Sequence, residues 1–266
     1  MPVINANGVD LYYVDTGGPG EVMVFSHGLL MNNKMFAQQI DEFKAEYRCI
    51  AYDHRGQGQS EVALAGYDMD TIAEDGAALI RALNIGPVHF VGLSMGGFVG
   101  MRLATRNPEL LKSLVLLETS ADPEPEENKP KYRKLNFFAR WFGLGSMAAK
   151  VMPIMFGQSF LNDPDRAEQR KEWQGQIASS RRIGMTRAVQ GVIDRSGVYE
   201  QLSSIKTPTL IVVGKEDVAT VPAKSERIHA ALKGSELVVL PKGGHSSTIE
   251  EPVAVNAAIT GFLEAR

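Results

Sequence analysis

Short apolar segments alternate with longer amphipathic segments along most of the chain. The apolar segments have the length and composition of β-strands, and residues 21–26 are apolar almost throughout, as expected for a strand buried on both faces. Strands are predicted at residues 9–14, 21–26, 48–52, 88–92, 112–117, 209–213 and 236–240. Apolar positions at helical spacing predict helices at residues 34–46, 68–83, 95–106, 222–232 and 252–265. This alternation predicts an α/β fold with a mostly parallel sheet.

The alternation stops between Asp122 and Leu202, where no buried strand is evident. An acidic, Pro-containing linker occupies residues 122–127. Amphipathic segments after it predict helices at about residues 129–142, 146–156, 164–180 and 184–194. We therefore expect a core domain formed by residues 1–121 and 203–266, with a helical cap, residues 122–202, inserted on one side of the sheet.

The sequence Gly92-Leu-Ser-Met-Gly-Gly97 contains the pattern G-x-S-x-G between a predicted strand and a predicted helix. This is the context in which the pattern forms a nucleophile elbow, because the glycines allow a tight turn that exposes the serine hydroxyl. The alternative is a Gly-rich turn that carries an ordinary serine. The flanking strand and helix favour Ser94 as a nucleophile.

A serine hydroxyl needs a base, and His245 is the best candidate. It lies in the loop after the last predicted strand, and open α/β sheets place their sites at the carboxyl ends of strands. Core packing, loop ordering or surface exposure accounts for the other four histidines: we expect His27 to order its loop, His54 to be structural, His89 to pack in the core and His229 to lie on the surface.

The imidazole in turn needs a carboxylate, and Asp217 follows the predicted strand at residues 209–213. The resulting chain order of Ser94, Asp217 and His245 fits the G-x-S-x-G context. Glu216 and Asp122 are rivals, and Asp217 could instead be a turn or capping residue.

An oxyanion would need two backbone N–H donors. Met95 supplies one because it directly follows Ser94, and the second should come from the loop after an earlier strand. We assign that role to Leu29, since Gly28 lets the backbone of this loop approach closely.

Four segments occur in the order typical of one known family: residues 26–28 (Ser-His-Gly), 53–58 (Asp-His-Arg-Gly-Gln-Gly), 92–97 and 244–245 (Gly-His). On these motifs the chain resembles the α/β-hydrolase superfamily, and the similarity covers nearly the whole chain. The resemblance implies a mostly parallel eight-stranded sheet with a lid after the sixth strand. Within the superfamily the chain is similar to small esterases, enol-lactonases and cofactor-free perhydrolases.

The resemblance also implies roles for individual residues. Ser94 would be the nucleophile, His245 the base and Asp217 the acid, with Leu29 and Met95 as oxyanion donors. A serine at the elbow argues against epoxide hydrolases and haloalkane dehalogenases, which use an aspartate nucleophile. The Leu-Leu-Met sequence at residues 29–31 departs from the Gly-rich oxyanion loop of many carbon–carbon bond hydrolases.

Aromatic and Met residues are concentrated in the predicted cap, and most of them should pack the cap onto the sheet. A few should line a substrate pocket, and our candidates are Trp141, Phe142, Met155 and Phe156. Arg181, Arg182 and Arg187 are interpreted as solvated helix residues rather than as a carboxylate clamp.

Composition limits the remaining possibilities. Lys plus Arg number 28 and Asp plus Glu 31, so the net charge of −3 offers no general attraction to nucleic acid or an anionic membrane. Cys49 is the single cysteine, which excludes an intrachain disulfide. The chain has no apolar run long enough to span a bilayer, no secretory signal pattern and no metal or dinucleotide motif. We expect a cytoplasmic protein that needs no metal or cofactor and binds neither nucleic acid nor membrane; its oligomeric state stays open.

These features predict a serine hydrolase that cleaves small carboxylic esters or lactones through an acyl-enzyme. Amide or thioester cleavage would use the same groups. Two alternatives stay open: a cofactor-free perhydrolase, in which peroxide replaces water, and a ligand sensor that retains the three residues but signals through its cap. Neither the acyl group nor the alcohol can be identified from the sequence.

Overall fold

The computed structural model describes residues 2–266, and within them the chain forms one eight-stranded sheet in the order β1-β2-β4-β3-β5-β6-β7-β8. β2 runs antiparallel to β1 and β4, and the other neighbouring strands are parallel. The strands are β1 (Val3–Ala6), β2 (Val9–Asp15), β3 (Val22–Ser26), β4 (Arg48–Tyr52), β5 (Val88–Leu93), β6 (Leu111–Leu117), β7 (Thr209–Gly214) and β8 (Glu236–Leu240). The predicted fold class is confirmed.

The hydrophobic pattern predicted seven of these strands and missed β1. β1 is short, pairs only with β2 and has three of its four residues at least partly exposed. Its sequence therefore lacks the buried apolar run that marks the central strands. Its pairing with β2 supplies the eighth strand that the family resemblance implies.

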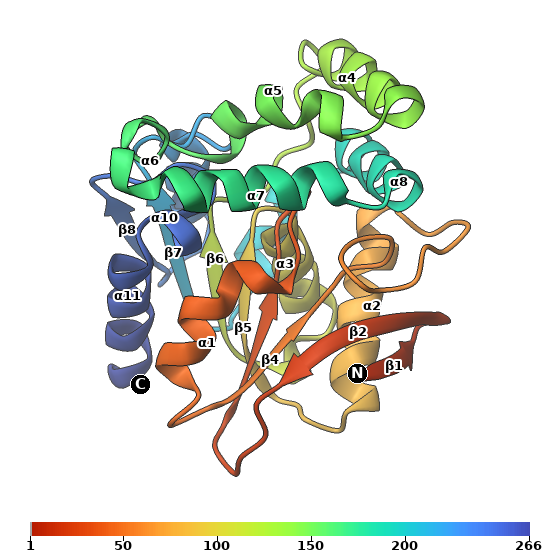
Figure 1. The fold of residues 1–266 in the computed structure, drawn as a ribbon. Helices are drawn as coiled ribbons and strands as arrows, with labels where there is room; N and C mark the ends of the chain where they lie inside the picture. Colours follow the sequence, from red (N-terminus) through yellow and green to blue (C-terminus); the bar gives the residue numbers. More distant parts are fainter. Residues whose placement is uncertain (1) are drawn as a thin grey trace.

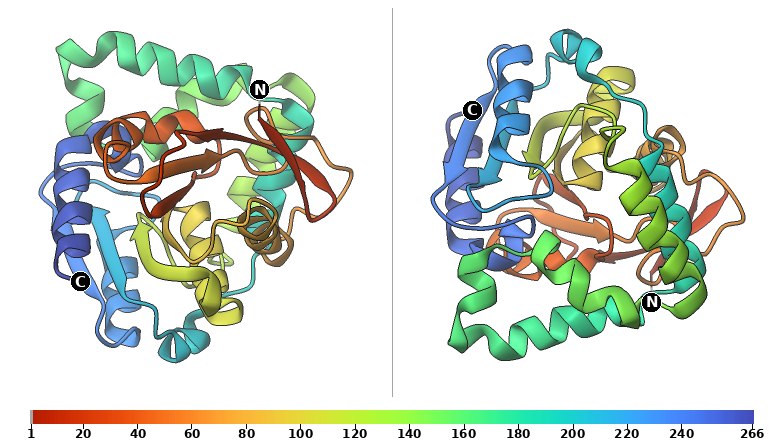
Figure 2. Two further views of the ribbon diagram at one scale, coloured as in Figure 1. Left: turned by 90° about the horizontal axis from the view of Figure 1, so that it is seen from below. Right: turned by 90° about the horizontal axis from the view of Figure 1, so that it is seen from above.

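Helices cover both faces of the sheet. α1 (Ala37–Phe43) and α11 (Pro252–Glu264) lie on one face, and α2 (Met69–Ala82) and α3 (Met95–Arg106) lie on the other (Figure 2). α9 (Pro222–Ala231) packs on the same face as α2 and α3. Within β3, Met23 and Phe25 pack on the face covered by α1 and α11, whereas Val24 packs on the face covered by α2 and α3. This alternation explains why the central strands are apolar at every position.

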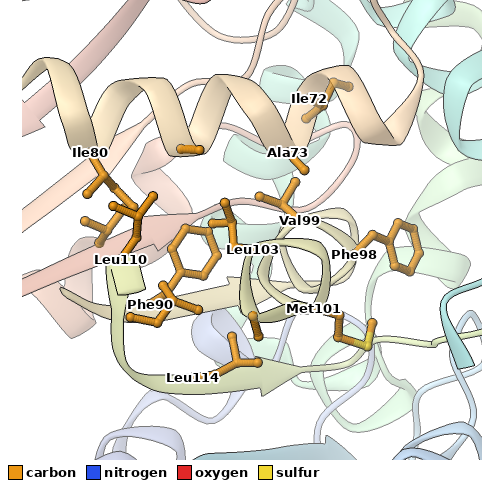
Figure 3. Packing of buried hydrophobic residues seen from close by; sticks show 14 of the residues in the cluster. Ile72, Ala73, Ile80, Phe90, Phe98, Val99, Met101, Leu103, Leu110 and Leu114 are labelled. Carbon is orange, nitrogen blue, oxygen red and sulfur yellow. The ribbon is translucent and has the colours of Figure 1, made fainter. Parts of the chain in front are cut away.

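The core beneath α2 and α3 is made of interleaved side chains from both helices and the sheet. Figure 3 shows Ala73 of α2 facing Val99 of α3, and Ile80 of α2 facing Leu110, with Phe90 of β5 on the sheet side. These side chains are fully or almost fully buried. The close packing fixes the start of α3 against the sheet, and α3 begins directly after Ser94.

Five helices lie between β6 and β7 in the chain and cover the carboxyl ends of the central strands (Figure 1). They are α4 (Lys129–Phe142), α5 (Gly145–Met155), α6 (Gln158–Asn162), α7 (Ala167–Ser179) and α8 (Arg182–Ile193). The sequence pattern predicted four of them and missed the five-residue α6. It also missed α10 (Ser247–Glu250), a single turn that follows β8. No helix in residues 2–266 has the length and apolar composition needed to cross a membrane.

Candidate active site

Ser94 stands at the sharp turn between β5 and α3, with φ +52° and ψ −107°. A residue other than glycine is strained in this conformation. The surrounding packing holds the turn closed: a Cβ atom on Gly92 would lie 2.3 Å from the carbonyl oxygen of Gly96, and one on Gly96 would lie 1.9 Å from that of Ser26. The two glycines of the motif are therefore required by the close approach of three backbone segments.

The structure brings Ser94, His245 and Asp217 into one hydrogen-bonded chain. His245 lies after β8, and its Nε2 atom is 2.8 Å from the Ser94 Oγ atom. Its Nδ1 atom is 3.0 Å from Oδ2 of Asp217, which lies after β7. In this arrangement a neutral imidazole protonated on Nδ1 donates to the carboxylate and presents the lone pair of Nε2 to the hydroxyl.

Asp217 is almost completely buried and is held by the turn that follows it. Its Oδ1 atom accepts hydrogen bonds from the backbone N–H groups of Ala219 and Thr220, at 2.8 and 3.0 Å. The hydroxyl of Thr220 donates to Oδ2 at 2.7 Å. Burial raises the pKa of Asp217, but the charge of His245 and these hydrogen bonds lower it more, so its pKa lies below the usual value. The carboxylate is thus kept charged beside the imidazole.

Thr220 was not singled out from the sequence. Its Oγ1 atom lies 2.7 Å from Asp217 and 3.2 Å from Nδ1 of His245, so it contacts both partners of the pair. A threonine three residues after an aspartate is an ordinary turn pattern. Only the placement of His245 beside that turn makes the threonine part of the site.

The two predicted oxyanion donors lie on backbone segments that meet at the elbow. Met95 begins α3, and Leu29 lies in the loop after β3, where a Cβ atom on Gly28 would be 3.5 Å from the Cβ atom of Ser94. Within residues 2–266 neither the Met95 nor the Leu29 amide donates a hydrogen bond. Their role as oxyanion donors therefore stays a prediction.

Buried polar groups hold the Leu29 loop in place. The side chain of Gln57 accepts a hydrogen bond from the backbone N–H of Leu30 at 3.2 Å. The Nε2 atom of His27 accepts a hydrogen bond from the backbone N–H of His54 at 3.0 Å, and its Nδ1 atom lies 2.7 Å from the carbonyl oxygen of Gly28. Burial lowers the pKa of His27, so the ring is neutral. The expected loop-ordering role of His27 fits these contacts, whereas Gln57 was not singled out from the sequence.

The rivals of Asp217 have other partners. Asp122 accepts hydrogen bonds from Lys224 and Arg227, at 3.0 and 3.2 Å. Glu216 accepts one from the backbone N–H of Ser159 in α6 at 2.7 Å and a second from the hydroxyl of the same residue. Glu216 therefore connects α6 of the cap to the loop after β7. Neither Asp122 nor Glu216 contacts His245.

One expectation about basic side chains was wrong, and another held only in part. His89 does not pack in the core: it lies partly buried between Ser113 and Glu21, with both ring nitrogens 2.8 Å from their partners. Arg181 and Arg182 are exposed, as expected, but Arg181 also donates to the backbone carbonyl oxygens of Gln57 and Ser60. Arg187 is only partly exposed and donates to the carbonyl oxygen of Ala63. These bonds of Arg181 and Arg187 join the cap to the core, and neither residue lines the cavity that contains Ser94.

A cavity of about 180 Å³ lies between the cap and the elbow. Ser94 and His245 are part of its wall, and most of the remaining wall is apolar. The lining residues are Leu29, Leu30, Ser94, Phe98, Glu124, Tyr132, Leu135, Asn136, Ala139, Leu144, Met147, Val151, Ile154, Met155, Val189, Val192, Ile193, Arg195, Ala219, Thr220 and His245.

Of the four predicted pocket residues, the cavity wall includes only Met155. Trp141 and Phe142 lie on the outer surface of α4, with 66% and 68% of their surface exposed. Phe156 is buried but stacks on Phe160 in the core, with ring centroids 4.7 Å apart. α4 turns Tyr132, Leu135, Asn136 and Ala139 toward the cavity, whereas Trp141 and Phe142 near its end face away from it.

Two buried glutamates near the site were also missed. Glu118 directly follows β6 with φ +41°, and neither of its side-chain oxygens has a hydrogen-bond partner in residues 2–266. Burial and the charge of Asp217 raise its pKa well above the usual value, so the group is held neutral.

Glu250 accepts backbone hydrogen bonds from Gly157, Gly244 and Ser246, which connects α6 to the His245 loop. The position of Glu118 at a strand end was a usable sequence signal.

Residues 21–252 match the family described as the α/β-hydrolase fold. A relative from Pseudomonas syringae pv. syringae, "Putative carbamate hydrolase RutD", is 28% identical over 91% of this chain and 93% of its own length. The solved structure of the enol-lactonase from Burkholderia xenovorans LB400 has a TM-score of 0.92 at 26% identity and covers 99% of this chain and all of its own. A thermophilic esterase from Thermogutta terrifontis, solved with malate bound, has a TM-score of 0.91 at 29% identity, covering 99% and 98%.

The match over most of the chain, the shared architecture and the hydrolytic activities in these names agree with each other and with the motifs of the sequence. The chain is a hydrolase and belongs to the α/β-hydrolase family.

Proposed function

We propose that the protein hydrolyses neutral carboxylic esters or lactones through an acyl-enzyme formed on Ser94. The observation that carries the proposal is the hydrogen-bonded chain of Ser94, His245 and Asp217 at the wall of an apolar cavity. The similarity to an esterase and an enol-lactonase supports the same reaction class, since an enol-lactone is a cyclic ester.

In the first half of the reaction, His245 Nε2 takes the proton of the Ser94 hydroxyl as Oγ forms a bond to the carbonyl carbon of the substrate. The carbonyl oxygen becomes an oxyanion, which the amides of Leu29 and Met95 stabilise. A donor of this kind typically contributes roughly 3 kcal/mol to transition-state stabilisation. The tetrahedral intermediate then collapses, and the alcohol leaves with the proton held by His245.

In the second half, His245 takes a proton from water, and the water oxygen attacks the acyl carbon. Collapse of the second intermediate restores the Ser94 hydroxyl and releases the carboxylic acid. Asp217 stays ionised throughout, because its role is to orient the ring and stabilise the imidazolium. Its lowered pKa fits that role.

A series of p-nitrophenyl esters from acetate to decanoate, together with simple lactones, tests this proposal. We expect hydrolysis by the wild-type protein and a loss of at least roughly 10⁴-fold in kcat for Ser94→Ala. The melting temperature of the variant serves as the folding control. Undiminished hydrolysis by folded Ser94→Ala would refute the acyl-enzyme.

A further inference from the structure

The wall of the cavity contains one buried ion pair, formed by Glu124 and Arg195. Arg195 Nη1 lies 2.9 Å from Glu124 Oε2, and the side chains are only 6% and 12% exposed, respectively. Glu124 lies in the segment that leaves β6 for the cap, and Arg195 lies where the chain returns from α8. The pair thus joins the two connections between cap and core.

Backbone oxygens fix the guanidinium in this position. Its Nε group donates to the carbonyl oxygen of Asp122 at 3.2 Å, and Nη1 donates to that of Val192 at 2.8 Å. The Nη2 group makes no hydrogen bond to any residue in the range 2–266. It therefore keeps unused donor capacity.

The ion pair is close to the reacting end of the cavity. The guanidinium carbon of Arg195 lies 4.6 Å from the ring centroid of Phe98. Phe98 is one helical turn beyond Ser94, whose carbonyl oxygen accepts the Phe98 N–H at 3.1 Å. Because Ser94, Phe98 and the ion pair line the same cavity, an acyl group bound to Ser94 shares that space with the pair.

The charge balance of the wall decides which acyl groups fit there. No other Lys, Arg, Asp or Glu is among the described residues that line the cavity. Glu124 cancels the one arginine charge, so a substrate carboxylate would lose its hydration without gaining an unpaired cation, and it would also face the charge of Glu124. Such an uncompensated buried charge is strongly unfavourable.

We propose that Glu124 is a specificity-determining residue: by neutralising Arg195, it makes the cavity accept uncharged acyl groups and reject those that carry a free carboxylate. The remaining donors of Arg195 would bind a neutral acceptor, such as a second ester or amide carbonyl. A lactone formed from a hydroxy- or keto-dicarboxylic acid keeps one free carboxylate and is therefore expected to be a poor substrate. This inference rests on the proposed ester hydrolysis and narrows its substrate class.

Three esters of similar length test the proposal: p-nitrophenyl hexanoate, mono-p-nitrophenyl adipate and methyl p-nitrophenyl adipate. They differ only in the terminal group, which is a methyl, a carboxylate or a methyl ester. For the wild-type protein we expect kcat/KM for the carboxylate to be at least roughly 100-fold below that for the methyl ester. In Glu124→Gln, which leaves the Arg195 charge unpaired, this ratio should fall at least roughly tenfold.

Glu126→Gln is the matched control, because it removes the same charge from the same linker at an exposed side chain that does not line the cavity. Its substrate ratio should equal that of the wild type. Glu124→Asp retains the charge and should retain the discrimination.

Equal wild-type rates on the carboxylate and the methyl ester would overturn the inference, and this measurement needs no variant to fold. A Glu124→Gln protein that cleaves esters with the wild-type ratio would overturn it as well. Failure of the proposed function looks different: either no ester is cleaved, or cleavage persists in Ser94→Ala.

Discussion

The Nε2 atom of His245 lies 2.8 Å from the Oγ atom of Ser94, although 151 positions separate the two residues in the chain. Ser94 ends the connection from β5 to α3, and His245 lies beyond β8 at the edge of the sheet. The contact forms because parallel strands end at the same edge, where the loops that follow them converge. The same edge carries Asp217, so three loops from distant parts of the sequence build one site.

Replacing the strained Ser94 by glycine should abolish activity but cost less stability than replacing it by alanine. Ser94 has φ +52°, a conformation that glycine adopts without a Cβ clash. We expect Ser94→Gly to have a free energy of unfolding about 1 kcal/mol higher than that of Ser94→Ala, while both variants lose hydrolysis. Chemical denaturation of the two proteins measures the difference. A lower value for the glycine variant would mean that the elbow stores no strain.

Asp217→Asn should greatly reduce the rate. An amide in this position favours the wrong imidazole tautomer, so kcat should fall by about 10⁴-fold with a smaller change in KM. Glu216→Gln and Asp122→Asn are the matched controls, because they make the same kind of change at carboxylates that do not contact His245. Steady-state kinetics on one ester measures all three, and a greater loss in either control would transfer the role of the acid to that residue.

Thr220 is expected to be a positioning residue for the Asp217–His245 pair. Thr220→Val keeps the shape of the side chain but removes the hydroxyl that donates to Asp217. We expect kcat to fall roughly tenfold, because this charge-assisted hydrogen bond orients the carboxylate. Thr220→Ser, which restores a hydroxyl, should recover most of the loss. Equal loss in both variants, at unchanged melting temperature, would assign Thr220 a packing role only.

Glu118 should make the stability of the protein depend on pH. Its pKa is raised in the folded state, so above the unfolded value of 4.5 the unfolded chain loses a proton that the folded protein keeps. The contribution of Glu118 to stability is therefore greatest below that value and declines as the pH rises toward the folded pKa. In Glu118→Gln this decline is absent.

The free energy of unfolding of Glu118→Gln should therefore rise relative to wild type between pH 5 and 8, by at most about 1.4 kcal/mol per pH unit. Denaturant unfolding across this range measures the difference. Glu127→Gln, at an exposed position in the linker, is the control and should show a constant difference. A constant difference for Glu118→Gln as well would show that the buried group does not titrate between the two states.

Much of the fold could be predicted from the sequence, because the relevant signals are local. A strand buried on both faces must be apolar at every position, as residues 21–26 and 88–92 are, and a helix that covers the sheet must repeat its apolar residues every three or four positions. The elbow at Ser94 is local too, since glycines two residues on either side are needed for the turn itself. β1 was missed because an edge strand that is largely exposed carries no such pattern.

The sequence by itself determined which loops could supply the reactive groups and favoured Asp217 as the acid, but it left Asp122 and Glu216 as rivals. Each of these carboxylates follows a strand, and only the tertiary structure turns Asp217 toward His245 while Lys224 and Ser159 occupy the other two. The same limit explains the errors in the cap. The sequence shows which residues share one face of a helix, but which face meets the core depends on how neighbouring helices cross it. For this reason the exposed Trp141 and Phe142 of α4 were wrongly predicted to line the pocket. The ion pair of Glu124 and Arg195 could not be predicted for the same reason. The two residues are 71 positions apart, and only the packing of the chain brings them together, so neither local sequence indicates the contact.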